Sequence, residues 1–258
     1  MIPVTRRIAL LAASDLVRAS PARRDDVAQY DQELDALAPA FAAEGLDLVE
    51  ADWRAPSLQA DAALALTVWD YQDAAEAFLA SLRALESRGV PVLNPPSLAE
   101  WNIRKTYLRD LEARGVRIAP TLWPDDPRAG DIAAAFDAFG CEEVVLKRQV
   151  GAGAKGQLRL RRGEGLEEGP LLDRPGMIQP FLPSVTEEGE LSFLFVDDAL
   201  SHAVVKRAAA GDYRIQPRYG GVSRAIEPAP ADLAAARSVL EALTPRGSAK
   251  PPLYARVD

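Results

Sequence analysis

A glycine-rich stretch between two apolar segments constrains the fold of this chain more than any other feature. Residues 142–162 read EEVVLKRQVGAGAKGQLRLRR, and their glycines match the dinucleotide-binding pattern G-x-G-x-x-G. In a Rossmann unit this pattern opens a helix, so that the pyrophosphate meets the helix N-terminus. Residues 158–161 instead alternate apolar and charged side chains, which is the period of a half-buried strand. The sequence therefore predicts a glycine-rich hairpin that joins two strands.

A hairpin of this kind can fold over a triphosphate. Gly151, Gly153 and Gly156 leave the backbone exposed, so that its N–H groups can face phosphate oxygens. Lys147 lies at the end of the preceding apolar strand, where a purely structural lysine is unusual. Together these residues indicate ATP as the ligand. An NAD(P)-dependent oxidoreductase is an alternative hypothesis, and it requires a helix at residues 157–162.

The composition is that of a globular protein with an acidic surface. The 258 residues are 48% apolar and 26% charged, with a formal net charge of −8. A net negative surface repels nucleic acid and anionic membranes, so neither is expected as a partner. The single cysteine, Cys141, cannot form an intrachain disulfide, which fits the reducing, cytoplasmic environment. No apolar run approaches the length needed to span a membrane. The sequence leaves the oligomeric state undetermined, so a homo-oligomer is one alternative.

Residues 1–95 alternate predicted strands and helices, which implies a parallel sheet. The apolar run at residues 8–13 is interpreted as the first strand rather than as a signal peptide. Pro39 lies inside the first predicted helix and should kink it or split it. Asp70 follows the third strand at the carboxyl end, where ligands gather in open α/β sheets, and is a candidate substrate contact. The predicted strands are 8–13, 46–51, 62–69 and 90–93, and the predicted helices are 27–44 and 74–88.

The remaining residues mix helices and strands without that regular alternation. Ser97 to Glu100 have the spacing of a capping box, which predicts a helix from there to about Arg114, with Lys105 in its second turn. A polar loop is expected at residues 208–221. Further helices are predicted at 131–140 and 231–243, and further strands at 177–181, 190–196, 202–207 and 253–257.

These pieces, in this order, resemble an ATP-grasp ligase of the glutathione synthetase and RimK-like group over most of residues 94–258. The resemblance implies an α/β and α+β chain, in which the ATP-grasp fold follows an N-terminal Rossmann-like (pre-ATP-grasp) domain. On that basis residues 1–95 form the Rossmann-like domain and residues 96–172 the first ATP-grasp subdomain, which carries the glycine-rich loop. Residues 173–258 form the second subdomain.

The resemblance also implies which residues bind the nucleotide. Lys105, which follows an Asn-Pro turn, resembles the first phosphate-contacting lysine of the family, and Lys147 resembles the second. The loop with Gly151, Gly153 and Gly156 would cover the phosphates. The hinge strand, whose backbone binds adenine, corresponds to Gln179, Pro180 and Phe181, and Glu190 corresponds to the acidic residue at the ribose.

Catalytic, substrate-binding and metal-binding residues are implied in the same way. Lys206 and Arg214 resemble the basic residues near the γ-phosphate and the acyl phosphate, and Gly220 and Gly221 match the glycine pair of the substrate loop. Asp258 matches the first metal carboxylate. In the family a Glu-x-Glu or Glu-x-Asn follows one short hairpin later, whereas this sequence stops at Asp258. We therefore expect a second subdomain truncated at its C-terminus, with an incomplete magnesium site.

The activity implied by the resemblance is ATP-dependent carboxylate-amine ligation through an acyl phosphate. The substrates would be a small amino-acid-like carboxylate and an amine, with ATP and Mg²⁺, or Mn²⁺, as cofactors. The missing carboxylates leave an alternative, a catalytically incomplete ATP-grasp-like module that binds nucleotide without turnover. A protein kinase is excluded, because the only histidine, His202, cannot supply the catalytic-loop motif and no Asp-Phe-Gly occurs.

Overall fold

The computed structural model describes residues 5–55, 58–166, 168–243 and 251–258. The chain divides into two compact units, Met1–Ile103 and Arg104–Asp258. The domain boundaries predicted after residues 95 and 172 stay predictions. Within the described stretches, none of the helices combines the length and the apolar character needed to cross a membrane.

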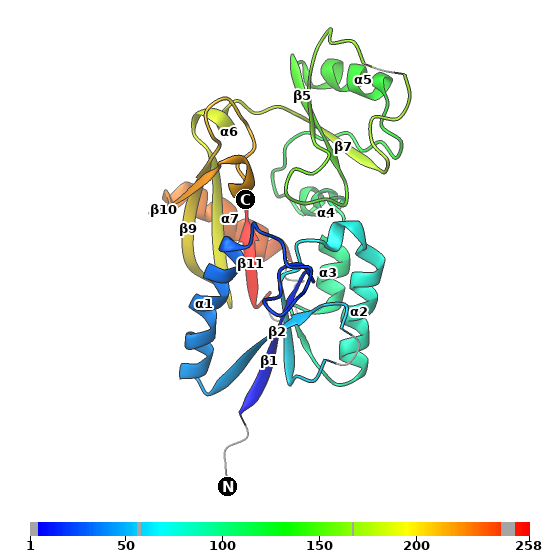
Figure 1. Ribbon diagram of the computed structural model, residues 1–258. Helices are drawn as coiled ribbons and strands as arrows, with labels where there is room; N and C mark the ends of the chain where they lie inside the picture. Colours follow the sequence, from blue (N-terminus) through cyan, green and yellow to red (C-terminus); the bar gives the residue numbers. More distant parts are fainter. Residues whose placement is uncertain (1–4, 56–57, 167, 244–250) are drawn as a thin grey trace. The chain divides into compact units, whose positions relative to one another are not determined.

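The first unit is built on a four-stranded parallel sheet in the order β2-β1-β3-β4. Strand β1 pairs on both sides and its residues 8–12 are buried, which explains an apolar run without polar alternation. Helices α1 and α2 lie on opposite sides of the sheet (Figure 1), as the Rossmann-like prediction requires. The elements are β1 (Arg6–Ala12), α1 (Ala28–Ala43), β2 (Leu46–Asp52), β3 (Ala62–Thr67), the short 3₁₀ helix η1 (Tyr71–Asp73), α2 (Ala75–Ser87), β4 (Val92–Leu93) and α3 (Pro96–Asn102).

Helix α1 is not split at its proline. Pro39 lies inside an uninterrupted helix that runs from Ala28 to Ala43, so the expected split does not occur, while the alternative of a kink stays a prediction. An interior proline removes one backbone hydrogen bond and costs about 3 kcal/mol. The surrounding residues are rich in alanine, the strongest helix former, and the helix buries Tyr30 and Leu34 against the sheet side. Propensity and packing together outweigh the proline.

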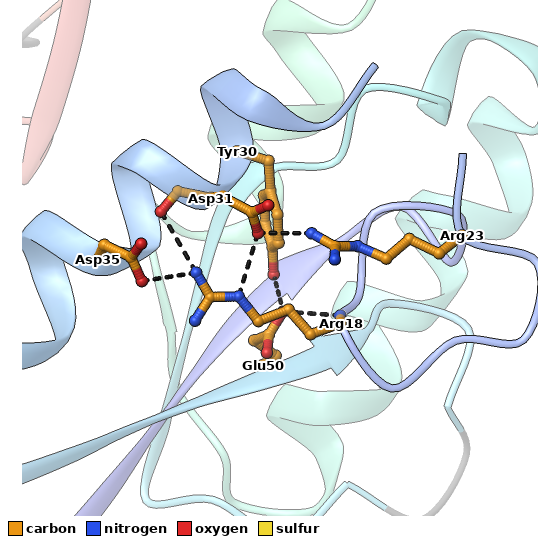
Figure 2. Close-up of polar contacts among 6 residues, drawn as sticks. All are labelled: Arg18, Arg23, Tyr30, Asp31, Asp35 and Glu50. Atoms are coloured by element: carbon orange, nitrogen blue, oxygen red, sulfur yellow. Dashed lines mark hydrogen bonds and ion pairs between the residues drawn. The ribbon is translucent and has the colours of Figure 1, made fainter. Parts of the chain in front are cut away.

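A polar network holds the long connection between β1 and α1, residues 13–27 (Figure 2). The Arg18 side chain donates from Nε to Asp31 Oδ1 at 3.1 Å and from Nη2 to Asp35 Oδ1 at 2.6 Å. Its backbone N–H donates to Glu50 Oε1 on β2 at 3.0 Å. Connections longer than about a dozen residues are uncommon without an anchor or a function. Two further contacts complete the network, from Arg23 Nη2 to Asp31 at 2.5 Å and from Tyr30 Oη to Glu50 at 2.6 Å.

Removing Arg18 from this network is expected to destabilise the first unit. For Arg18→Met we expect the midpoint of thermal unfolding to fall by roughly 2–5 °C, because two carboxylates lose a shared partner. The matched control is Arg7→Met, whose single ion pair with Asp47 spans 3.4 Å between side chains that are 53% and 49% exposed. That control should unfold like the wild type, and equal losses in the two variants would contradict a stabilising network.

The network also predicts a pH dependence for that difference. Hydrogen bonds from Arg23 and Arg18 hold the pKa of Asp31 below its ordinary value. A carboxyl group with a lowered pKa stabilises the folded state above its unfolded pKa, and this stabilisation is lost as the pH falls through the folded pKa. The gap in thermal stability between wild type and Arg18→Met should therefore narrow in acid.

The second unit begins with a three-stranded antiparallel sheet in the order β6-β5-β7. Strands β5 and β6 form the predicted hairpin, with the glycine-rich loop between them. The oxidoreductase hypothesis requires a helix at residues 157–162. A strand follows the loop there instead, so the glycine-rich loop is not a Rossmann dinucleotide-binding loop. Helix α5 packs Ile132 and Phe136 against this sheet. The elements are α4 (Tyr107–Ala113), α5 (Ala129–Phe139), β5 (Glu143–Arg148), β6 (Leu158–Arg161) and β7 (Gly176–Pro180).

The second unit also contains a four-stranded antiparallel sheet in the order β10-β9-β8-β11, with α7 packed on it. Strand β10 directly follows the predicted polar loop and was not expected, because its sequence VSRAI is mostly exposed at the sheet edge and lacks an apolar stripe. The elements are α6 (Ser184–Glu187), β8 (Glu190–Val196), β9 (Ala199–Arg207), the 3₁₀ helix η2 (Pro217–Tyr219), β10 (Val222–Ile226), α7 (Pro230–Leu243) and β11 (Tyr254–Val257).

The prediction of one continuous helix from Ser97 to Arg114 is wrong, because two helices occupy this stretch. Residues 103–106 separate α3 from α4, and Lys105 lies in this break rather than in a helical turn. Helix α3 starts one residue earlier than expected, with a proline in its first turn and no side-chain cap, so the capping box does not form. The Lys105 N–H donates to the carbonyl of Gln149 at 2.8 Å, a tertiary bond that replaces a helical one.

Candidate functional site

Two lysines from distant parts of the second unit come together beside the glycine-rich loop. Lys105 Nζ donates to the carbonyl oxygen of Gly151, and Lys147 Nζ donates to Gln179 Oε1 at 3.0 Å. We call Lys105, Lys147, Gly151 and Gln179 the paired-lysine site. Burial, together with the positive charge of Lys147, lowers the pKa of Lys105 to about 8. The two amino groups therefore share one poorly solvated region.

The lysine charges in this site favour an anionic ligand. Burial also lowers the pKa of Lys147, and the Glu190 carboxylate offsets part of that effect. Burying an ammonium group disfavours its charged form, and a second ammonium nearby disfavours it further. A phosphate group between the two amines would relieve both penalties. The residues present thus fit the polyphosphate of a nucleotide in charge and in donor chemistry.

The glycine-rich loop adopts a left-handed backbone that favours glycine at two positions. Gly153 and Gly156 have φ angles of +59° and +68°, in the left-handed region. A Cβ atom at position 156 would lie 2.8 Å from Nε of Arg148, so a larger residue there would push the arginine away. The loop is also joined to residues 208–221, because Arg218 Nη2 donates to the carbonyl of Gly153. These contacts hold the loop close to β5 and to the later polar loop.

The expected hinge strand is β7 and the residue after it. The side chain of Gln179 is buried, with 8% of the residue exposed. Its Oε1 accepts a hydrogen bond from the Lys147 amine, and its Nε2 donates one to Thr121 Oγ1 at 3.0 Å. Its side chain therefore orients a lysine, which is a different task from the backbone contact expected of it. Phe181, just past Pro180, lies under the guanidinium of Arg159, with 3.6 Å from Cζ to the ring centroid.

A second polar cluster lies on β8, β9 and the residue after β11. Glu190 stands opposite Lys206 in the strand register, and Lys206 Nζ lies 3.2 Å from Glu190 Oε1 and 3.0 Å from Asp258 Oδ1. Ser192 donates to the Asp258 carboxylate. We call Glu190, Ser192, Lys206 and Asp258 the carboxylate cluster. Burial and the nearby Asp258 raise the pKa of Glu190, because two carboxyl groups share one region.

The carboxylate cluster supplies oxygen ligands of the kind that Mg²⁺ takes. Magnesium in nucleotide sites is held by one or two carboxylates together with phosphates and waters. Across the stretches of chain that the structure describes, no group of three or more His, Cys, Asp or Glu side chains could hold a metal alone. The Asp258 carboxylate fits a metal that is shared with a bound nucleotide, and the ribose contact expected of Glu190 stays a prediction.

Arg214 lies on the loop at residues 208–221, and its predicted catalytic role stays a prediction. In the described residues its side chain pairs with Asp212 at 2.7 Å and stacks on Tyr219, with Cζ 3.8 Å from the ring centroid. Gly220, on the same loop, has φ of +80°, and a Cβ at Gly221 would overlap the carbonyl of Ile215. Both glycines are therefore needed for the shape of the loop.

Asp70 has structural partners in the first unit. Its carboxylate accepts Trp53 Nε1 at 2.8 Å and pairs with Arg54 Nη1 at 2.5 Å. These contacts tie the residues that follow β2 and β3 together, and the substrate contact expected of Asp70 stays a prediction. Sequence reasoning missed Thr121, Ser192 and Arg218. Only Ser192 carried a signal, because it lies two residues after Glu190 and so shares its face of the strand.

Comparisons with known proteins bear on the fold of this chain. Residues 8–94 match the family model for the N-terminal domain of D-cycloserine synthetase DcsG. The crystal structure of D-cycloserine synthetase DcsG superposes with a TM-score of 0.80 at 21% identity, covering 97% of this chain and 85% of that one. The chain has the ATP-grasp fold. A RimK domain ATP-grasp protein from Sphaerobacter thermophilus DSM 20745 gives a TM-score of 0.62 at 20% identity, covering 92% of this chain and 82% of that one.

A curated relative extends the ATP-grasp comparison to sequence. Glutathione synthetase of Prochlorococcus marinus (strain MIT 9313) is 38% identical over 149 residues, which are 54% of this chain and 45% of that protein. The predicted resemblance to ATP-grasp ligases of the glutathione synthetase and RimK-like group is thus confirmed. The chain spans between 45% and 63% of the length of the curated relatives that it matches.

Proposed function

We propose that this chain binds ATP with Mg²⁺ and joins a carboxylate to an amine. The observation that carries the proposal is the paired-lysine site beside the glycine-rich hairpin, where two poorly solvated ammonium groups face one region. The solved structures that resemble this chain include ligases, among them D-alanine–D-alanine ligase of Bacillus anthracis complexed with ATP. In this proposal residues 96–172 and 173–258 act as the two ATP-grasp subdomains around the nucleotide.

The proposed reaction has two steps and needs little covalent help from the protein. A substrate carboxylate oxygen attacks the γ-phosphorus, the bond from that phosphorus to the bridging oxygen breaks, and ADP leaves. The amine nitrogen then attacks the acyl carbon, the bond from that carbon to the phosphate oxygen breaks, and the nitrogen loses a proton as the amide forms. Positioning and charge neutralisation dominate such phosphoryl transfers.

Each side chain has a defined task in this proposal. Lys105 and Lys147 neutralise the phosphates, and the N–H groups of the glycine-rich loop cover them. Asp258 would hold the magnesium ion, which supplies positive charge at the phosphates, and Glu190 would meet the ribose. Lys206, whose amine pairs with Glu190 and Asp258, would supply positive charge near the transferred phosphoryl group. Arg214 would reach that group only after leaving Asp212, with which it pairs at 2.7 Å.

The substrate class follows from the relatives and is part of the proposal. D-cycloserine synthetase DcsG and D-alanine–D-alanine ligase are both named for amino-acid-derived products. We propose a small amino-acid-like carboxylate, joined either to a second molecule or within one molecule. The second candidate function is nucleotide binding without turnover. It is favoured by the Asp258 carboxylate, which Ser192, Lys206 and Arg256 already engage.

Turnover separates the two candidate functions. ADP release is measured with the 258-residue chain, ATP, Mg²⁺ and a panel of amino acids, singly and in pairs, against reactions without amino acid. We expect ADP release that depends on both an amino acid and Mg²⁺, and that Asp258→Asn reduces at least tenfold because a metal ligand is lost. Saturable ATP binding without amino-acid-dependent release would instead establish the non-catalytic module.

A further inference from the structure

Gln149, the first residue after β5, is a buried polar side chain at the centre of the paired-lysine site. It is 2% exposed, and a buried amide is costly unless its polar atoms have partners. Nε2 donates to the carbonyl of Gly176 at 2.8 Å, and Oε1 accepts Nη1 of Arg104 at 3.2 Å. The backbone of Gln149 is bonded as well, from its N–H to Pro175 O at 2.9 Å and from Lys105 N–H to its carbonyl at 2.8 Å.

These four hydrogen bonds join three segments that each carry a part of the site. The break at residues 103–106 carries Lys105, and it is held at two consecutive residues by the carbonyl and the amide of Gln149. The glycine-rich loop starts immediately after Gln149 and provides Gly151, which accepts the Lys105 amine. Strand β7 starts at Gly176, and further along it Gln179 holds the Lys147 amine.

We propose that Gln149 is a positioning residue for the paired lysines, and that its amide sets where the Lys105 amine lies relative to the glycine-rich loop and Lys147. The inference rests on the proposed function in one respect, that the two lysines bind nucleotide. Glutamine suits the position because it donates to one carbonyl and accepts from one guanidinium at the same time. Methionine has a similar length and shape but offers neither hydrogen bond.

The inference differs from a purely structural role in one measurable respect. If Gln149 only stabilised the fold, its loss would lower the melting temperature and leave the folded site unchanged. If it positions Lys105, the amine should leave its buried place in the folded variant. The charged groups that face Lys105 are Lys147 on β5 and, beyond that lysine, Glu190 on β8, with Arg104 beside it in sequence. Movement away from Lys147 and into water would raise the pKa of Lys105 toward its ordinary 10.5.

The experiment compares wild type, Gln149→Met and Arg104→Met, with Thr67→Val as the matched control. Thr67 is fully buried in the first unit and donates to the carbonyl of Leu11 at 3.1 Å, so its variant also loses a buried hydrogen bond. Two quantities are measured on each folded protein. One is the calorimetric Kd for ATP with Mg²⁺. The other is the pH of half-maximal acetylation of Lys105 by trace acetic anhydride, read by mass spectrometry.

For Gln149→Met we expect the Kd for ATP to rise about tenfold or more and the half-reaction pH of Lys105 to move upward by about one unit or more. Arg104→Met should shift both in the same direction by less. Thr67→Val should melt earlier than the wild type and shift neither. Unchanged values in a folded Gln149→Met variant would overturn the inference.

The outcomes also separate this inference from the proposed function. If the wild type fails to bind ATP, the proposed function fails, and the Lys105 titration still decides whether Gln149 positions the amine. If Gln149→Met does not unfold cooperatively, Arg104→Met decides. Arg104 is exposed on the surface and its loss is not expected to prevent folding. An Arg104→Met protein with wild-type affinity and wild-type Lys105 titration would then overturn the inference.

Discussion

Lys147→Met is expected to weaken ATP binding by about 30- to 150-fold, because a hydrogen bond to a charged group contributes about 2–3 kcal/mol. Lys147 lies at the end of a buried strand, and its amine is held by Gln179 beside the glycine-rich loop. Methionine keeps most of the volume of the side chain and removes the charge together with the hydrogen bonds of the amine. The Kd for ATP with Mg²⁺, measured by calorimetry at low ionic strength, checks the prediction.

The matched control removes one positive charge from the neighbouring strand. Arg161 on β6 has a side chain that is 69% exposed, and it pairs with Glu143, which Arg159 also engages. Arg161→Met therefore changes the net charge of the protein by the same amount without touching the paired-lysine site. Its Kd should stay within about twofold of wild type, since exposed charges are screened by solvent and salt. Similar affinities in the two variants would contradict a phosphate contact from Lys147.

Sequence reasoning found those parts of the fold that local patterns determine. The alternation of Leu158 to Arg161 distinguishes a strand from a helix without any knowledge of the rest of the chain, and the hairpin prediction is confirmed. The apolar run of β1 is also a local pattern, and it predicted a core strand without knowledge of the rest of the chain. Strand β10 escaped because an exposed edge strand needs no apolar stripe, and its pairing with β9 is visible only in three dimensions.

The helix expected at residues 97–114 failed for a tertiary reason that bears on function. Its residues have ordinary helix propensity, yet the N–H of Lys105 bonds to Gln149 in the other half of the site instead of to its own helix. Sequence patterns do not contain that bond. The break it creates directs Lys105 toward Gly151, so the local departure from regular structure coincides with the candidate site.

The chemistry of the site was predictable only in part. Lys147 was indicated by its place at the end of an apolar strand before the glycine-rich loop. Lys105 was inferred only from a resemblance, because no spacing rule links a lysine after an Asn-Pro turn to one on a later strand. Gln149 and Thr121 carried no sequence signal, since a buried polar residue cannot be recognised before its partners are known. Asp70 was inferred from its place after a parallel strand, where ligands gather. The structure adds its partners Trp53 and Arg54, and its substrate contact stays a prediction.

ATP binding is expected to weaken as the pH rises through about 8 and to take up protons in that range. Burial and the charge of Lys147 lower the pKa of Lys105 to about 8 in the free protein. A bound phosphate favours the ammonium form and so raises that pKa in the complex. Affinity is therefore full below the free pKa and is lost at higher pH, by at most about tenfold per pH unit.

Calorimetry in buffers of different ionisation enthalpy measures this proton uptake directly. The titrations run from pH 7.5 to 9.5, above the last phosphate ionisation near about pH 6, so that the nucleotide keeps one charge state. Lys105→Met should bind ATP weakly and should lose the dependence on pH and the proton uptake together. Wild-type affinity that is equal at pH 7.5 and pH 9.5 would contradict a shifted lysine in the phosphate site.

The same lysine predicts opposite effects on binding and on stability. Because the folded pKa of Lys105 lies below the unfolded value of 10.5, the unfolded chain binds more protons between the two values. Wild-type stability should therefore rise with pH across that window, and Lys105→Met should lack the rise. Near neutral pH the variant should exceed the wild type in free energy of unfolding by on the order of 1–3 kcal/mol. A variant that binds ATP poorly and is also less stable would indicate a damaged fold, whereas weaker binding with greater stability identifies a charge held in place for its ligand.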